Sequence, residues 1–167
     1  MNEFGFSIPQ NITVGRGTLG KLGEAAKKLG GTHAFIISGP HLEKMGLVAR
    51  AEGYLADAGI KADAYTDIEA NPSVTTVEKA TEAFRASGAD FIVAFGGGSP
   101  MDVAKAVGVV AKYGGSITDY EGAHKVPGKI VPLIAIPTTA GTGSEVTAFS
   151  VITDHSRDYK LTVFSYE

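Results

Sequence analysis

The chain has 167 residues, 44% of them hydrophobic, which is long enough for one domain around a single buried core. Its 15 basic and 18 acidic residues give a formal net charge of -3 without any basic run, so nucleic acid is not an expected partner. Cysteine is absent, which excludes disulfides, thiolate nucleophiles and cysteine-ligated metals.

The N-terminal segment lacks a signal-peptide pattern, and nowhere does an apolar stretch approach the roughly 20 residues that span a bilayer. We therefore expect a cytoplasmic protein that makes no membrane contact. Two short apolar stretches, residues 4–8 and 12–14, are separated by Pro9, which edge strands tolerate and central strands do not. They predict edge strands, and the first is available to pair with another chain.

Between residues 19 and 136, short apolar runs alternate with longer segments of helical period, a pattern typical of repeated βα units. It predicts a Rossmann-like α/β domain, in which helices cover both faces of a parallel sheet. The expected strands are residues 34–38, 62–65, 91–95 and 130–136, the last interrupted by Pro132. The expected helices are residues 19–29, 42–58 with a break near Gly46, 74–87 with Ser73 as N-cap and Gly88 at the end, and 101–111. Residues 147–153 and 159–164 are expected to form a hairpin.

A glycine-rich segment, residues 96–100, lies between an apolar strand and the start of a predicted helix. A helix start exposes unpaired backbone N–H groups and the positive end of the helix dipole, and glycines let a pyrophosphate approach closely. The spacing matches neither a Walker loop nor the Gly-x-Gly-x-x-Gly fingerprint. From the glycines alone, a plain strand-to-helix turn is an equally good interpretation.

A second loop, residues 137–145, follows the last strand of the repeated pattern and carries four hydroxyl side chains and two glycines. Its hydroxyls can bond phosphate, ribose or carboxamide oxygens, although local capping of the next segment is the alternative. If the two preceding strands are parallel neighbours, both loops meet at the carboxyl edge of the sheet, where ligands bind in such folds. Together the loops indicate a dinucleotide cleft.

Residues 96–105 (GGGSPMDVAK) and 137–145 (PTTAGTGSE) resemble the iron-containing (group III) alcohol dehydrogenases. The resemblance covers essentially the whole chain, but only the N-terminal nucleotide-binding domain of that family. It implies a dehydroquinate-synthase-like N-terminal domain over residues 1–167, with NAD or NADP as cofactor. The implied cofactor-binding residues are Gly96, Gly97, Gly98, Ser99, Thr138, Thr139 and Thr142.

Asn71, Asp102 and Lys160 match family positions close to the cofactor. From the residues alone, Asn71 is equally well a turn residue and Lys160 a solvated surface lysine. Asp102 is expected in the first turn of its helix, where a carboxylate stabilises the dipole. Gly39 stands where many family members carry an acid that binds the adenosine ribose. Without that carboxylate a 2′-phosphate is not repelled, so NADP becomes acceptable or preferred.

The resemblance implies a divalent metal, iron or zinc, bound only by a helical second domain of a longer parent protein. We expect no metal on this chain, because Asp154, His155 and Asp158 lie in a predicted turn that does not bring them to one ion. Without metal and second domain, hydride transfer by the chain itself is expected to be negligible. The chain ends on a strand-like apolar run, residues 161–167, without a closing helix or polar tail, so we expect it to be a truncated piece of a longer protein.

The resemblance thus implies an NAD(P)-dependent dehydrogenase that interconverts a small alcohol and its aldehyde or ketone in a homodimeric parent. One alternative is a glycerol-dehydrogenase or dehydroquinate-synthase-like enzyme, against which residues 137–145 argue. The other alternative is a stand-alone, non-catalytic nucleotide-binding or assembly module.

Overall fold

The computed structural model describes residues 10–165, so the edge strand expected at residues 4–8 lies outside the described part. Its main sheet is built from β1 (His33–Ser38), β2 (Lys61–Tyr65), β3 (Phe91–Gly96) and β5 (Leu133–Pro137). Its helices are the 3₁₀ turns η1 (Thr18–Lys21) and η2 (Ile117–Tyr120) with α1 (Leu22–Leu29), α2 (Pro40–Lys44), α3 (Leu47–Asp57), α4 (Val74–Ser87) and α5 (Gly98–Tyr113). A second, smaller sheet comprises β4 (Gly122–Ala123), β6 (Phe149–Asp154) and β7 (Tyr159–Phe164).

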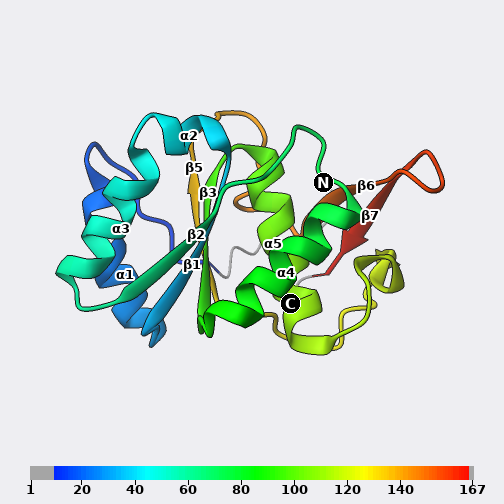
Figure 1. The fold of residues 1–167 in the computed structure, drawn as a ribbon, viewed down its shortest axis with the longest axis horizontal. Helices are drawn as coiled ribbons and strands as arrows, with labels where there is room; N and C mark the ends of the chain where they lie inside the picture. Colours follow the sequence, from blue (N-terminus) through cyan, green and yellow to red (C-terminus); the bar gives the residue numbers. More distant parts are fainter. Residues whose placement is uncertain (1–9, 166–167) are drawn as a thin grey trace, which may run out of the picture.

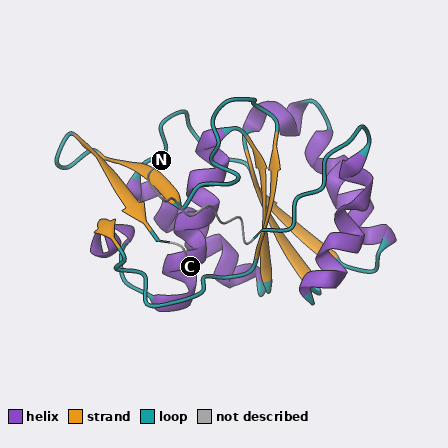
Figure 2. Cartoon of the chain, turned by 180° about the vertical axis from the view of Figure 1, so that it is seen from behind, coloured by secondary structure: helices purple, strands orange, loops and turns teal. Residues whose placement is uncertain are grey.

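The main sheet is parallel throughout, in the order β2-β1-β3-β5. Helices α1 and α3 cover one face, and α4 and α5 cover the other, as Figures 1 and 2 show from opposite sides. The central strands β1 and β3 are buried almost end to end, which explains their unbroken apolar sequences. The edge strand β2 is mostly exposed and carries charged residues. The predicted parallel sheet with helices on both faces is confirmed.

The small sheet lies beside α4 and α5, and its β-hairpin is at the right of Figure 1. Strands β6 and β7 pair antiparallel, as predicted, and β4 adds to β7 in parallel. One face of the hairpin is buried through Ile152, Leu161 and Val163, which join the core formed by α4, α5 and the main sheet. The hairpin is therefore packed into the domain and is not a free flap.

Several expected boundaries are wrong, each for a local reason. Residues 12–14 are not a strand, and the side chain of Val14 is 90% exposed. The strand expected from residue 130 begins only at Leu133, because the Val131 N–H bonds to the Gly108 carbonyl on α5. The helix expected at residue 101 begins at Gly98, because a helix start tolerates a proline such as Pro100, whose missing N–H has no intrahelical partner there.

Three other helices begin close to where the sequence predicts. Residues 19–29 divide into η1 and α1, and residues 42–58 divide into α2 and α3 at Gly46, which has a φ of 70°. The side chain of Ser73 accepts a hydrogen bond from the Thr76 N–H and so caps α4. Across the described residues no helix has the length and apolar character needed to cross a membrane.

Candidate functional site

The glycine-rich loop and the threonine-rich loop lie side by side at the carboxyl edge of the main sheet. Strands β3 and β5 are parallel neighbours whose register places Gly96 opposite Pro137. The N–H of Thr138 donates to the carbonyl oxygen of Gly96 at 2.9 Å, so the two loops separate from directly bonded strands. The juxtaposition that the sequence made conditional on strand order is therefore present.

Close packing requires glycine at two positions of the first loop. Gly96 has a φ of +153°, and a Cβ there would lie 2.8 Å from Cγ of Pro100. At Gly97 a Cβ would lie 3.0 Å from the hydroxyl oxygen of Thr139. Gly98 is different, since a Cβ there would meet Thr142 only at an ordinary 3.8 Å. The loops are thus packed tightly where they touch, and they leave space at the start of α5.

Helix α5 begins without any side-chain cap. Its N-cap is Gly97, which has no side chain to accept a hydrogen bond, and no acidic residue lies in its first turn. The N–H groups of Gly98 and Ser99 consequently have no intrahelical partner, and the positive end of the helix dipole is uncompensated. Thr138, Thr139 and Thr142 are exposed beside this helix start. Backbone donors, a helix dipole and hydroxyls in one place form a cradle for a phosphate group.

Asp102 does not occupy the position predicted for it. Because α5 begins at Gly98, Asp102 belongs to the second turn, and its carboxylate points into a polar cluster. The hydroxyl of Ser144 donates to its Oδ1 at 2.7 Å, and the N–H of Val151 donates to its Oδ2 at 3.2 Å. Burial raises the pKa of Asp102, although the hydrogen bond from Ser144 and the charge of Lys105 act in the opposite direction. A role in compensating the dipole of the first turn is therefore excluded.

Lys105, which sequence reasoning passed over, completes this cluster. Its Nζ donates to the Ser144 hydroxyl at 3.0 Å and to the backbone carbonyls of Thr147 and Phe149 at 3.1 and 2.8 Å. Burial lowers the pKa of Lys105, against the opposing effect of the charges of Asp102 and Glu145. The sequence holds one hint, the i, i+3 spacing of Asp102 and Lys105, which places them on one face of a helix.

Asn71 and Lys160, both exposed, are brought together by the fold. The Nζ of Lys160 on β7 donates to Oδ1 of Asn71 at 2.8 Å. Asn71 lies in the turn before α4 with a φ of 57°, and the N–H of Thr153 on β6 bonds to the carbonyl of the adjacent Pro72 at 2.8 Å. The hairpin is thereby attached both to this turn and, through Val151, to α5.

Gly39 follows β1 at the same edge of the sheet and is the N-cap of α2. The preceding Ser38 is in register with Phe95, one residue before the glycine-rich loop. No heavy atom lies within 4 Å of a Cβ built on Gly39. A side chain at this position would therefore point into open space close to the glycine-rich loop.

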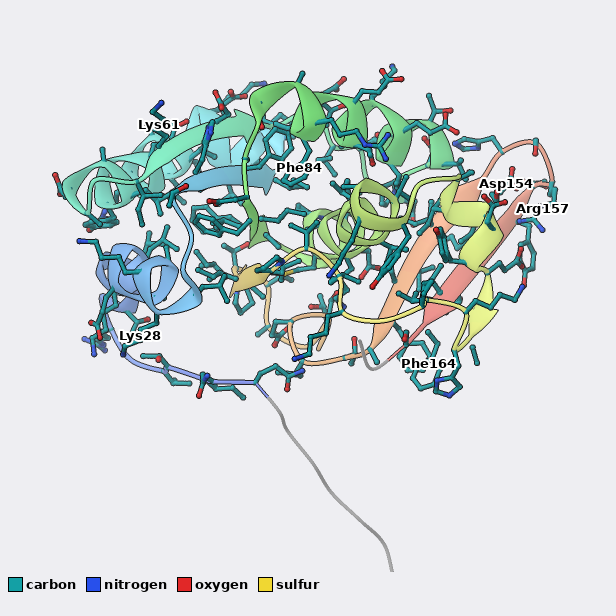
Figure 3. All side chains as sticks on the ribbon, turned by 90° about the horizontal axis from the view of Figure 1, so that it is seen from below. Lys28, Lys61, Phe84, Asp154, Arg157 and Phe164 are labelled. Carbon is teal, nitrogen blue, oxygen red and sulfur yellow. The ribbon has the colours of Figure 1, made fainter. Side chains whose placement is uncertain are left out.

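The turn of the hairpin holds an ion-pair network. Asp154 accepts hydrogen bonds from Ser156 and from Arg157, and Arg157 also contacts Glu121 at 2.8 Å. Figure 3 shows Asp154 and Arg157 next to each other at this turn. The hydrogen bonds from Ser156 and Arg157 lower the pKa of Asp154 to about 2. Within residues 10–165 no group of three or more His, Asp or Glu side chains is arranged to hold a metal ion.

Comparison with known proteins agrees with this geometry. The family model described as iron-containing alcohol dehydrogenase matches residues 9–167. The chain is 38% identical to the NAD-dependent methanol dehydrogenase of Bacillus methanolicus over 158 residues, which are 95% of this chain and 42% of that enzyme. It is 41% identical to the choline dehydrogenase of Bacillus subtilis over 159 residues, 93% of this chain and 40% of that protein.

Solved structures give the same result. The crystal structure of a 1,3-propanediol oxidoreductase superposes with a TM-score of 0.93 at 34% identity, covering 98% of this chain and 43% of that one. The sulfoacetaldehyde reductase of Bifidobacterium kashiwanohense in complex with NAD+ superposes with a TM-score of 0.91 at 34% identity, covering 99% of this chain and 44% of that one. This chain thus spans less than half the length of these proteins, and it belongs to the iron-containing alcohol dehydrogenase family.

Proposed function

We propose that the chain is the nucleotide-binding domain of a nicotinamide-dependent alcohol dehydrogenase. The observation that carries the proposal is the contact between the two loops, in which the Thr138 N–H bonds to the Gly96 carbonyl beside an uncapped helix start. In a parallel α/β sheet, this edge is where dinucleotides bind. A structural neighbour in complex with NAD+ supports the same cofactor.

The residues present fit a dinucleotide. The pyrophosphate would be held by the N–H groups of Gly98 and Ser99, because a Cβ built on Gly98 approaches Thr142 only to 3.8 Å and space remains at this helix start. Thr138, Thr139 and Thr142 offer uncharged hydroxyls to the ribose and phosphate oxygens. Asn71 and Lys160, which bond to each other where the hairpin meets the turn before α4, would contact the nicotinamide half. When bound, the nicotinamide ring supplies the acceptor or donor of hydride, and the protein supplies position and charge.

The remaining parts of the reaction belong to a longer parent protein. The relatives that this chain matches are longer, and their printed names are of dehydrogenases and reductases. We therefore assign the substrate, a small alcohol or its aldehyde or ketone, to the interface between this domain and the rest of the parent. The divalent metal, iron or zinc, and the contacts of a homodimer belong to the same assignment. If the protein were instead a non-catalytic nucleotide-binding module, this domain would bind the same cofactor. The full-length protein would then not oxidise an alcohol, which distinguishes the two proposals.

The proposal is tested by titrating the chain with NAD+ in a calorimeter. Gly98→Asp places a carboxylate at the proposed pyrophosphate position. The helix dipole stabilises that carboxylate, and its charge repels the pyrophosphate. The matched control is Gly53→Asp, at an exposed helical glycine on α3 with open space around its Cβ. We expect the unsubstituted chain and the Gly53→Asp variant to bind NAD+, and the Gly98→Asp variant not to bind it. Equal affinity in the two variants would exclude this helix start as the pyrophosphate site.

A further inference from the structure

We propose that Asp102, Lys105 and Ser144 form a positioning clasp that holds residues 138–148 in the conformation that binds the cofactor. This inference rests on the proposed nucleotide site, and it assigns to the three side chains a role that needs no contact with the cofactor. In the clasp, Ser144 on the loop bonds to both Asp102 and Lys105 on α5.

The segment from Thr138 to Ala148 needs such an anchor because it has no regular secondary structure. It contains Gly141 and Gly143, both with positive φ, and residues 138–142 are exposed. The segment is fixed at its start by the bond from the Thr138 N–H to Gly96. Further along the segment, Ser144 is buried, with 7% of its surface exposed. The exposed hydroxyls of the threonine-rich loop therefore lie between two fixed residues, Thr138 and Ser144.

Lys105 fixes the return of the chain into β6. Its three ammonium hydrogens match three acceptors, the Ser144 hydroxyl and the carbonyls of Thr147 and Phe149. The Lys105 side chain is only 18% exposed, although the residues that supply the two carbonyls, Thr147 and Phe149, are themselves exposed. Asp102 adds the Val151 N–H on β6, and its own carbonyl accepts from the hydroxyl of Ser150. The chain from Ser144 to Val151 is thereby attached to α5 at several points.

The position of the clasp on α5 explains its consequence. Asp102 lies about one turn after the helix start at which we place the pyrophosphate. One helix therefore carries the phosphate-binding N–H groups and also sets the place of the threonine hydroxyls. A buried cluster of charged and polar groups is a poor source of stability, because desolvation offsets the attraction. Its hydrogen bonds are directional, however, and fix one geometry of the loop.

Affinity should follow the population of the clasped loop. When the competent conformation is only a tenth of the population, the apparent Kd rises about tenfold. Losing one buried hydrogen bond of ordinary strength shifts such an equilibrium by roughly three- to tenfold. Removing the Ser144 hydroxyl is the smallest change that takes away one bond to each partner, while the bond from Lys105 to the Thr147 carbonyl remains.

The test compares Ser144→Ala with Thr81→Ala by calorimetric titration with NAD+, at a temperature where melting curves show every variant folded. Thr81 is the matched control, a buried hydroxyl on α4 that bonds to the Val77 carbonyl. We expect Ser144→Ala to raise the Kd roughly three- to tenfold and Thr81→Ala to leave it unchanged. Asp102→Asn combined with Ser144→Ala should raise the Kd by less than the product of the single effects.

Hydrogen–deuterium exchange supplies a readout that a general loss of stability does not give. In Ser144→Ala, peptides covering residues 138–148 should exchange faster while those of α4 do not change, and saturating NAD+ should restore protection. If the unsubstituted chain binds NAD+ and Ser144→Ala binds it equally well, the clasp has no positioning role. If the unsubstituted chain itself does not bind NAD+, it is the proposed function that fails. Equal Kd increases in the Ser144 and Thr81 variants would also overturn the clasp.

Discussion

Lys160 and Asn71, 89 positions apart in the sequence, are joined by a 2.8 Å hydrogen bond from Nζ to Oδ1. The bond attaches the hairpin to the turn that precedes α4. Both partners are exposed, and Asn71 adopts a φ of 57°, which asparagine tolerates better than most residues. The backbone of Asn71 and its side-chain bond therefore make separable contributions to stability.

The first prediction separates these contributions by urea unfolding. Lys160→Met keeps the apolar stem and should lower the free energy of unfolding by no more than about 1 kcal/mol, because exposed hydrogen bonds contribute little. Asn71→Ala should lower it by about 1–2 kcal/mol, since alanine is strained at positive φ. Asn71→Gly is the control that relieves the strain and removes the same side chain. Equal losses for the alanine and glycine variants would show that backbone conformation is not the cause.

A second prediction concerns the choice between NAD and NADP at Gly39. Gly39→Asp introduces a carboxylate into open space at the N-cap of α2, a position that aspartate favours. We expect it to raise the Kd for NADP+ at least tenfold, by repelling the 2′-phosphate, and to lower the Kd for NAD+. Parallel titrations with the two dinucleotides measure both constants, with Gly53→Asp as the variant of equal charge. A parallel change in both constants would argue that Gly39 does not face the ribose.

Much of the fold could be predicted because the relevant signals are local. The apolar runs of β1 and β3 indicate strands buried on both faces, and Ser73 and Gly88 mark the two ends of α4. The carboxylate of Asp102 could not be placed, because its partners Ser144 and Val151 are 42 and 49 positions away and reach it only after the hairpin docks. Residue spacing within one helix carries no information about such a partner.

The third prediction follows from the lowered pKa of Asp154, which is about 2 in the folded chain against an ordinary value of 3.8. A carboxyl group with a depressed pKa stabilises the fold fully above its unfolded pKa, and loses that contribution as the pH falls toward its folded pKa. The stabilisation should therefore be present at pH 6 and decline between about pH 4 and 2. Melting temperatures of the unsubstituted chain and Asp154→Asn should differ at pH 6, and the difference should shrink steadily as the pH falls from about 4 to about 2. A constant difference down to pH 3 would mean that this ionisation does not support the hairpin turn.

The last prediction asks whether the hairpin unfolds with the rest of the domain, as its role in presenting Lys160 requires. Leu161 on β7 is far from α4 and α5 in the sequence, yet its side chain is fully buried in the core that packs against these two helices. Leu161→Ala should lower the free energy of unfolding of the whole chain by about 2–5 kcal/mol, through lost burial and the cavity left behind. Thr162→Ala, on the opposite face of the same strand, should change it by less than about 1 kcal/mol.

The measurement is urea unfolding followed by two signals, far-ultraviolet circular dichroism for the helices and hydrogen exchange for β6 and β7. Because the hairpin is bonded to α5 through Val151 and Ser150, both signals should shift together. If only the hairpin amides lose protection in Leu161→Ala while the helical transition is unchanged, the hairpin is an independent unit, and the geometry of Lys160 and Asn71 is not fixed by the core.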